Sequence, residues 1–128
     1  MRTLAIIVKV RITTTSNFLE NQSDREQNRF VFSYTVVISN EEKEAVQLMS
    51  RHWIIKDANS KQEEVIGEGV VGEQPIIQPG ESYQYTSGAI LDTEIGTMEG
   101  FYQMRYPDNT IKNATIPVFT LSVPRILH

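Results

Sequence analysis

A glycine-rich segment, Gly67-Glu68-Gly69-Val70-Val71-Gly72, is the part of the sequence whose spacing suggests chemistry. Glycines at this spacing occur in dinucleotide-binding proteins, where backbone amides and the first turn of a helix hold the pyrophosphate. No helix can follow the glycines here, because Pro75, Pro79 and Gly80 come within eight residues of the last one. The segment is therefore predicted to be a loop between strands.

Two interpretations of this loop remain open. Gly67, Gly69 and Gly72 allow positive φ angles, and successive amides could then form a nest that binds a nucleotide or pyrophosphate, so they are our candidate ligand-binding residues. Alternatively, the glycines serve only a sharp crossover between sheets. The second interpretation is favoured, because two glutamates flank the loop and no lysine or arginine follows until after Gln103. A cation would have to arrive from elsewhere in the fold to favour a phosphate.

The segment Arg51-His52-Trp53 is the second candidate for chemistry. Strand alternation separates His52 from its two neighbours. The single tryptophan lies in a mid-chain strand, where a sandwich keeps a core aromatic, so we expect Trp53 to be largely buried. His52 has the chemistry of a metal ligand or proton carrier, but a histidine without a second histidine nearby is more often a packing residue. We predict that His52, Glu73 and Gln74 contribute to an interaction surface.

Catalytic and metal-binding groups are sparse. The chain has no cysteine and only two histidines, one of them the last residue. Ser50 and Ser87 lack the strained turn that exposes a nucleophilic serine. The acidic side chains around the central loops lack the fixed spacing of a calcium-binding loop. We therefore predict no enzyme activity, no metal site and no cofactor.

Composition restricts the function classes further. A chain of 128 residues is expected to form one domain, residues 1–128. Its net charge of −4 argues against a surface that coats nucleic acid. The apolar start, Met1–Val8, is interrupted by Lys9 and Arg11, and no run reaches the roughly 18 apolar residues that span a bilayer. We expect a cytoplasmic protein that binds neither nucleic acid nor membrane.

Period-two alternation dominates the sequence, and turn residues recur at intervals of about 8–12 residues. Residues 15–28 are polar and are expected to form a long connection. Pro117 indicates either that its strand is an edge strand or that the strand begins anew at Val118. This pattern predicts an all-β protein, an antiparallel β-sandwich of the immunoglobulin or fibronectin type III kind. The expected strands are Leu4–Thr14, Phe30–Ser39, Val46–Lys56, Gln62–Ile66, Ile76–Gln78, Ser82–Ser87, Met98–Tyr106 and Ala114–Val123.

Several motifs together resemble the ApaG (CorD) domain family, from about residue 6 to residue 124. The similarity implies a fibronectin type III-like sandwich and an association with cobalt resistance and magnesium efflux. Related eukaryotic domains serve as protein-interaction modules. The family has no established catalytic activity. Ser60 stands where a glycine commonly closes the turn. The matching motifs are Ser50-Arg51-His52-Trp53-Ile54-Ile55-Lys56-Asp57, the glycine segment with Glu73-Gln74-Pro75, Pro79-Gly80-Glu81, Tyr85-Thr86-Ser87-Gly88, residues 96–104 and Ile116-Pro117-Val118-Phe119.

We therefore predict a non-catalytic binding module that acts through a protein partner in divalent-cation homeostasis. Strand edges also offer a route to a homodimer. Two rival functions remain. A basic group converging on Gly67–Gly72 would favour a phosphorylated ligand, and a polar pocket holding His52 with a carboxylate would favour a hydrolase.

Overall fold

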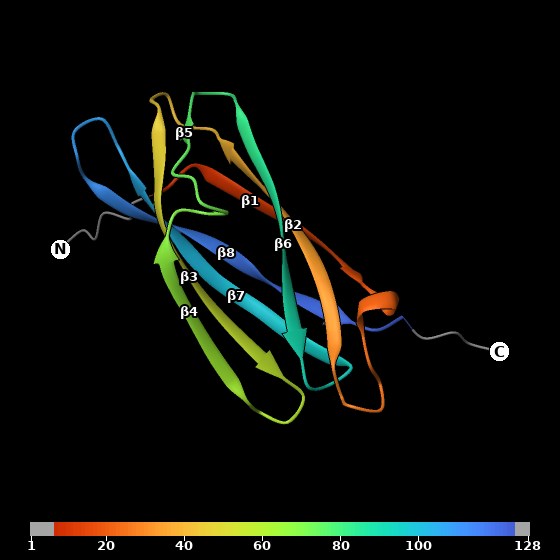
Figure 1. Cartoon of the computed structure of the whole chain (residues 1–128). Coiled ribbons are helices and arrows are strands. Elements are labelled where there is room, and N and C mark those ends of the chain that lie inside the picture. The colour runs from red at the N-terminus through yellow and green to blue at the C-terminus, as the bar shows by residue number, and fades with distance from the viewer. Residues whose placement is uncertain (1–6, 125–128) are drawn as a thin grey trace.

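The computed structural model describes residues 7–124, and nearly all of its regular structure is β-strand (Figure 1). One short 3-10 helix, η1 (Glu20–Gln22), follows the first strand. No helix within residues 7–124 is long and apolar enough to cross a membrane. The strands are β1 (Val10–Phe18), β2 (Phe30–Asn40), β3 (Val46–Asp57), β4 (Gln62–Glu68), β5 (Ile76–Ile77), β6 (Ser82–Leu91), β7 (Ile95–Arg105) and β8 (Ile111–Ser122).

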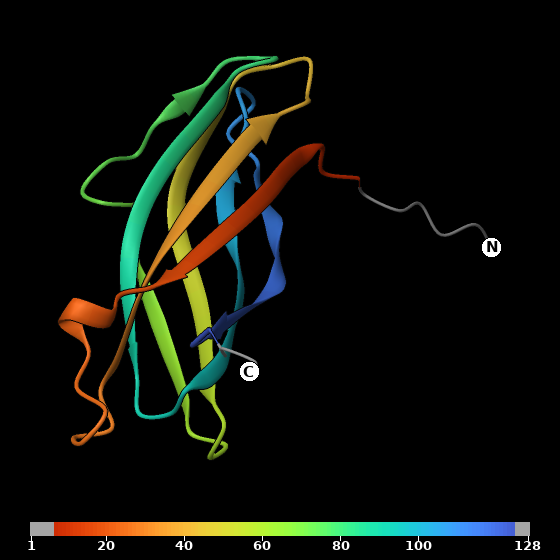
Figure 2. The same ribbon diagram turned by 90° about the vertical axis from the view of Figure 1, so that its right-hand side faces the viewer.

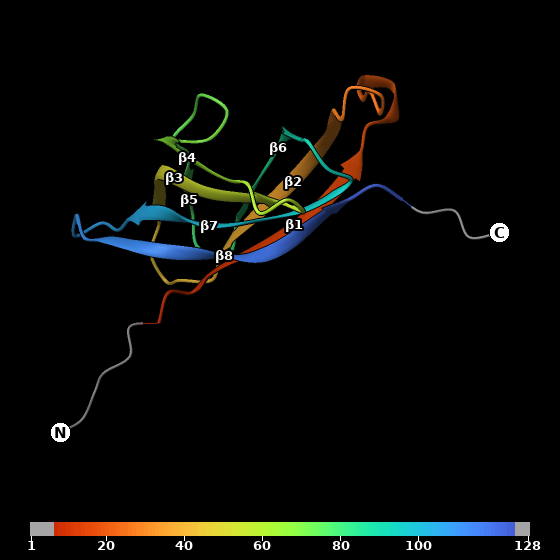
Figure 3. The same ribbon diagram turned by 90° about the horizontal axis from the view of Figure 1, so that it is seen from below.

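The strands form two antiparallel sheets that pack face to face, as the views along and across the layers show (Figures 2 and 3). One sheet has the order β1-β2-β6, and the other has the order β4-β3-β7-β8, with β5 pairing to the end of β3. This arrangement confirms the predicted all-β, immunoglobulin or fibronectin type III-like sandwich.

The core lies between the sheets and is built from the inward-facing residues of each strand. Trp53 is only 2% exposed, which confirms its predicted burial. Its ring lies 5.5 Å from that of Tyr34 on the opposite sheet and 6.2 Å from that of Tyr102 on β7, both in edge-to-face geometry. Such aromatic pairs add to the apolar area that the core already buries.

The first strand lies further along the chain than the sequence predicted. It was expected over Leu4–Thr14, but β1 begins at Val10 and continues to Phe18, and residues 4–6 lie outside the described part. The run of threonines after Ile12 favours a strand, because β-branched residues fit a pleated sheet. Phe18 then packs on Phe32, with ring centroids 5.4 Å apart. The predicted polar connection therefore starts later and contains η1.

Two other boundaries differ in a similar way. β6 continues through Gly88 to Leu91, where a loop was expected, because each residue from Ser82 onward keeps its partner on β2. Pro117 lies inside β8, which is the outer strand of its sheet, as predicted. The pairing of β7 with β8 shifts register beside it, which removes the need for a ladder bond from the proline.

The two sides of the sandwich differ. On one side β1 lies against β8, and the Ser16 hydroxyl donates to the Thr120 carbonyl across the sheets at 3.1 Å. On the other side the outer strands are β4 and β6, and residues 69–75 connect β4 to β5 there. Figures 1 and 2 show this connection projecting beside β6. The glycine segment thus lies at the open side of the sandwich.

Asn40, at the end of β2, is a buried polar residue with 1% exposure. Its side-chain amide donates to the Glu44 carbonyl at 2.8 Å and to the Ile77 carbonyl at 2.9 Å, and its side-chain oxygen accepts from the Glu42 amide. One side chain therefore joins a turn of the first sheet to β5 of the second.

Candidate functional site

The end of the glycine segment is a tight hairpin. Val70 and Glu73 exchange two backbone hydrogen bonds, of 2.8 and 2.9 Å. The two central residues have positive φ angles, 44° at Val71 and 81° at Gly72. Positive φ at both positions is typical of a type I′ turn, the two-residue connection that suits the twist of paired strands.

The three glycines have separate structural tasks. Gly67 belongs to β4, where a Cβ would lie 2.8 Å from Nη1 of Arg51. Gly69 has a φ of +62°, and a Cβ there would lie 2.2 Å from the Glu73 carbonyl oxygen, whereas a Cβ at Gly72 would meet nothing within 4 Å. The amides of Gly69, Val70 and Glu73 already donate within the chain, so they are not available to a phosphate.

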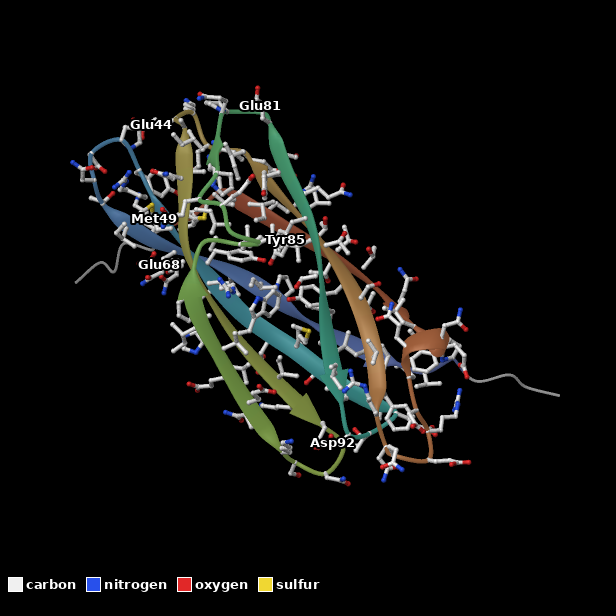
Figure 4. The ribbon with its side chains drawn as sticks, viewed as in Figure 1. Glu44, Met49, Glu68, Glu81, Tyr85 and Asp92 are labelled. Atoms are coloured by element: carbon white, nitrogen blue, oxygen red, sulfur yellow. The ribbon has the colours of Figure 1, made fainter. Side chains whose placement is uncertain are left out.

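Glu73 and Gln74, the predicted interaction residues, fasten the hairpin to both sheets. Tyr83 on β6 donates its hydroxyl to Oε2 of Glu73 at 3.0 Å. The side-chain amide of Gln74 donates to the Met49 carbonyl on β3 at 2.9 Å, and the Gly69 amide donates to the same carbonyl at 2.9 Å. Figure 4 shows Met49 beside the start of this connection. The hairpin is therefore held in position by hydrogen bonds.

A β-bulge at Met49 decides which residues of β3 face inward. The pairing with β7 shifts register between Leu48 and Ser50. Before the bulge Leu48 points into the core, and after it Trp53 does so, with Arg51 on the same face two residues earlier. The extra residue thus directs an arginine toward the interior, at the open side of the sandwich.

Arg51 converges on the glycine segment. Its Nη1 donates to the Glu68 carbonyl at 3.0 Å and to the Gly69 carbonyl at 2.9 Å. The guanidinium lies over Gly67, its cross-strand partner. This is the cation from a distant part of the chain whose presence would favour an anionic ligand.

A hollow of about 390 Å³ lies next to Arg51. Figure 4 shows Glu68 and Tyr85 near the connection, on β4 and β6. The hollow's other walls come from both sheets and from the hairpin. Its lining residues are Tyr34, Arg51, Glu68, Val70, Val71, Gly72, Tyr85 and Ser87.

Burial sets the electrostatics of the hollow. Desolvation raises the pKa of Tyr34 and of Tyr85, and the nearby Arg51 charge opposes part of each shift. Both phenols are therefore neutral hydrogen-bonding groups at neutral pH. The Tyr85 hydroxyl is hydrogen-bonded to that of Tyr102. The nearby Trp53 N–H lowers the pKa of Tyr85 slightly, yet within the described part of the chain this buried donor has no hydrogen-bond partner.

His52 lies elsewhere, on the outer face of the larger sheet. Its ring packs on that of Phe101 at 4.9 Å, and Nε2 lies 3.8 Å from Oε2 of Glu64. The carboxylate is half exposed, at 52%, so this pair lies on an open surface and not in a polar pocket. Within residues 7–124, no group of three or more His, Asp or Glu side chains is placed to hold a metal ion.

Of the predicted site residues, the structure brings together Gly67, Gly69, Gly72, Glu73 and Gln74, and it places His52 apart from them. Sequence reasoning missed the residues that face the glycine segment from the interior: Arg51, Tyr34, Tyr85 and Ser87. Alternation had already placed Arg51 on the same face as Trp53, which was expected in the core. A cation on a core-facing position was the available signal.

Comparison with known proteins identifies relatives across the chain. The ApaG domain matches residues 20–106. Protein ApaG of Methylobacillus flagellatus is 54% identical over 111 residues, which cover 87% of each chain, and Protein ApaG of Xylella fastidiosa is 51% identical over 120 residues, 94% of each. The crystal structure of a putative ApaA protein from Bordetella pertussis is 42% identical and has a TM-score of 0.88, covering 91% of this chain and 95% of the other.

Proposed function

Because the chain belongs to the ApaG domain family, we propose that it is a non-catalytic binding module that docks a protein partner through the hairpin Val70–Glu73. Val71 is the central contact residue of this proposed surface. The partner belongs to the machinery that handles divalent cations, in keeping with the family's association with cobalt resistance and magnesium efflux, and the module works in the cytoplasm.

The observation that carries the proposal is the conformation of Val71. A β-branched residue at a φ of 44° is an outlier, and a left-handed backbone costs roughly 1–2 kcal/mol in a residue with a Cβ. The side chain is 56% exposed, so burial within the free protein does not offset this cost. Backbone strain of this kind concentrates where proteins bind other molecules. A partner that covers Val71 would bury its apolar surface.

The hairpin is also preorganised. Its hydrogen bonds to Met49 and Tyr83 tie it to both sheets. A rigid turn loses little conformational entropy on binding, so more of the contact energy is retained as affinity. The bonds made by Glu73 and Gln74 thus support a binding surface in addition to shaping the loop.

The test compares partner capture by the wild-type protein and by Val71→Asn. Asparagine is well suited to positive φ, so this variant keeps the turn and removes the apolar side chain. Val118→Asn is the matched control, because Val118 is also a large exposed apolar residue, at 58%, but lies on β8. Proteins captured from native cytoplasm are identified and quantified by mass spectrometry for each.

We expect Val71→Asn to capture at least about 10-fold less partner than the wild-type protein, because it removes the central apolar contact of the surface. Val118→Asn should capture as wild type does. Cells that carry only Val71→Asn should tolerate cobalt as poorly as cells that lack the protein. Equal capture and equal cobalt tolerance in Val71→Asn would refute the proposal.

The homodimer stays a separate prediction. β4 and β6 are the outer strands on the open side, and an outer strand can pair with the same strand of a second copy. Light scattering over a range of protein concentrations tests this prediction, since edge pairing should give twice the monomer mass of 14.6 kDa.

A further inference from the structure

We propose that the hollow beside Arg51 binds a carboxylate group carried on a small apolar or aromatic body. This inference rests on the proposed function, because it names the chemistry that the binding face recognises. The carboxylate comes either from a free organic acid or from the terminus of a partner chain, and the two sources share the same recognition.

The first support is the free donor capacity of Arg51. A guanidinium carries five N–H donors in a planar fork. Nη1 is occupied by two backbone carbonyls, which fix the plane of the group over Gly67. Among the described residues, Nε and Nη2 have no hydrogen-bond acceptor, and Arg51 forms no salt bridge. These two nitrogens present the parallel N–H pair that matches a carboxylate.

Further donors surround the same space. The hydroxyls of Tyr34 and Ser87 approach each other, and both residues line the hollow. Trp53 does not line the hollow, but its buried N–H lies near Tyr85, which does, and has no hydrogen-bond acceptor among residues 7–124. An anion next to Arg51 would accept hydrogen bonds from the cationic guanidinium and from the neutral hydroxyls of the lining.

The charge balance favours a carboxylate over a phosphate. One guanidinium lines the hollow, and Glu68, whose backbone carbonyl accepts from Arg51, also lines it. Arg51 is the one cationic side chain in the lining, so a singly charged carboxylate adds less uncompensated charge there than a phosphate dianion or a pyrophosphate. The amides of Gly69 and Val70 are already engaged, so fewer backbone donors are left for a phosphate nest.

The walls indicate the body that carries the carboxylate. Val71, which is 56% exposed, supplies apolar surface beside the donors, and the largely buried Tyr34 and Tyr85 lie behind it in the lining. A volume of about 390 Å³ lies in the lower part of the range of small-ligand pockets. A single aromatic or branched apolar group with one carboxylate fits these limits.

The experiment follows the indole N–H signal of Trp53 by two-dimensional NMR, because the chain has only one tryptophan. The protein is titrated at constant ionic strength with sodium benzoate, with neutral benzamide and with pyrophosphate. Arg51→Gln removes the proposed anchor. Arg11→Gln is the matched control, since it removes the same charge from an exposed arginine on β1.

We expect benzoate to shift the Trp53 signal in a saturable way. Benzamide and the Arg51→Gln variant should bind at least about 10-fold more weakly, and Arg11→Gln should bind as wild type does. A peptide with a free terminal carboxylate that binds more tightly than benzoate would assign the source to a partner chain. Weaker binding of that peptide would assign it to a free acid.

Three outcomes would overturn the proposal. They are a shift that does not saturate, equal binding of benzoate and benzamide, and tighter Arg51-dependent binding of pyrophosphate, which would instead support the phosphorylated ligand. The benzamide comparison needs no variant, so the test holds even if Arg51→Gln unfolds. Failure here leaves partner capture through Val71 intact, and the two proposals are therefore distinguishable.

Discussion

The guanidinium of Arg51 occupies the space that a side chain at position 67 would fill. The two residues are cross-strand partners on β3 and β4, and a Cβ on Gly67 would lie 2.9 Å from Cζ of Arg51. The absence of a side chain at Gly67 therefore leaves room for the guanidinium of Arg51. Strand pairing thus accounts for the first glycine of the spacing that resembles a nucleotide motif, and positive φ angles account for Gly69 and Gly72.

Alanine substitutions at the three glycines should have different costs. Gly69→Ala places a Cβ against the backbone oxygen of Glu73 at a positive φ, so we expect a loss of about 2 kcal/mol or more in the free energy of unfolding. Gly72→Ala has the positive φ but open space, so we expect about 1 kcal/mol. Gly67→Ala should cost about 1 kcal/mol, because the flexible Arg51 side chain moves away and loses its hydrogen bonds. Urea unfolding measures all three.

The order of these costs is the decisive result. Gly72→Ala is the internal control for the effect of φ alone. If Gly69→Ala were no less stable than Gly72→Ala, the close contact with Glu73 would not determine the turn. If Gly67→Ala left benzoate binding unchanged, Arg51 would not depend on Gly67 for its position.

Substitution of Val71 by asparagine should stabilise the free protein. Asparagine tolerates positive φ much better than a β-branched residue, so we expect a gain of about 1 kcal/mol and a higher Tm. Val118→Asn, at a residue whose φ is not positive, should give no gain. Thermal unfolding by circular dichroism compares the two, and a lower Tm for Val71→Asn would contradict the assignment of strain.

Two substitutions of Trp53 should distinguish the stability that its aromatic packing contributes from the cost of its unpaired N–H. Trp53→Ala should cost roughly 3–5 kcal/mol, because the residue is 2% exposed between aromatic neighbours. Trp53→Phe keeps an aromatic ring and removes the unpaired N–H, so it should cost clearly less. Denaturant unfolding measures both variants. Equal losses would show that the ring kept in Trp53→Phe recovers no stability, and a water-exposed emission spectrum of the native protein would contradict burial.

Alkaline pH should destabilise the fold through buried phenols. Burial raises the pKa of Tyr85 and Tyr102 well above the ordinary value of 10.0. In the unfolded chain both phenols lose protons near pH 10, while the folded protein keeps them neutral. The contribution of these groups to the free energy of unfolding is therefore fully present below pH 10 and is lost as the pH rises through their folded values.

Urea unfolding on both sides of pH 10 tests this expectation. Tyr85→Phe should show a shallower alkaline decrease, because one buried phenol is gone. A phenolate absorbance that accounts for all five tyrosines in the still-folded protein would contradict it.

Much of the fold follows from local pattern. Alternation and turn residues predicted the strands, the antiparallel sandwich, the burial of Trp53 and the edge position of Pro117. Boundaries were less predictable, because pairing with a neighbour carries a strand past a polar run, as in β1, or through a glycine, as at Gly88. Cross-strand register depends on both paired segments and cannot be predicted from either one alone.

The candidate site was predicted only in part. The sequence identified the glycine segment, Glu73 and Gln74, and alternation placed Arg51 on the face of Trp53, but the pairing of β3 with β4 that brings Arg51 to the glycines was not predictable from either segment. The bulge at Met49 changes which face the following residues occupy, and no local residue type marks it. The hydroxyls of Tyr34 and Ser87 come from a sheet that meets the glycine segment only in the folded protein.

The buried Asn40 has a consequence for how the protein ages. Its amide group donates to two carbonyls, one beside the first sheet and one on β5. Hydrolysis of that amide to a carboxylate would exchange the donors for oxygens that repel both carbonyls. Slow deamidation of Asn40 would then weaken the contact between the two sheets. Burial of the Asn40 side chain also excludes water from the amide, which slows this reaction. Long-lived molecules should accordingly lose this contact only after local opening, so the useful lifetime of the protein is linked to the rate at which that end of the sandwich opens.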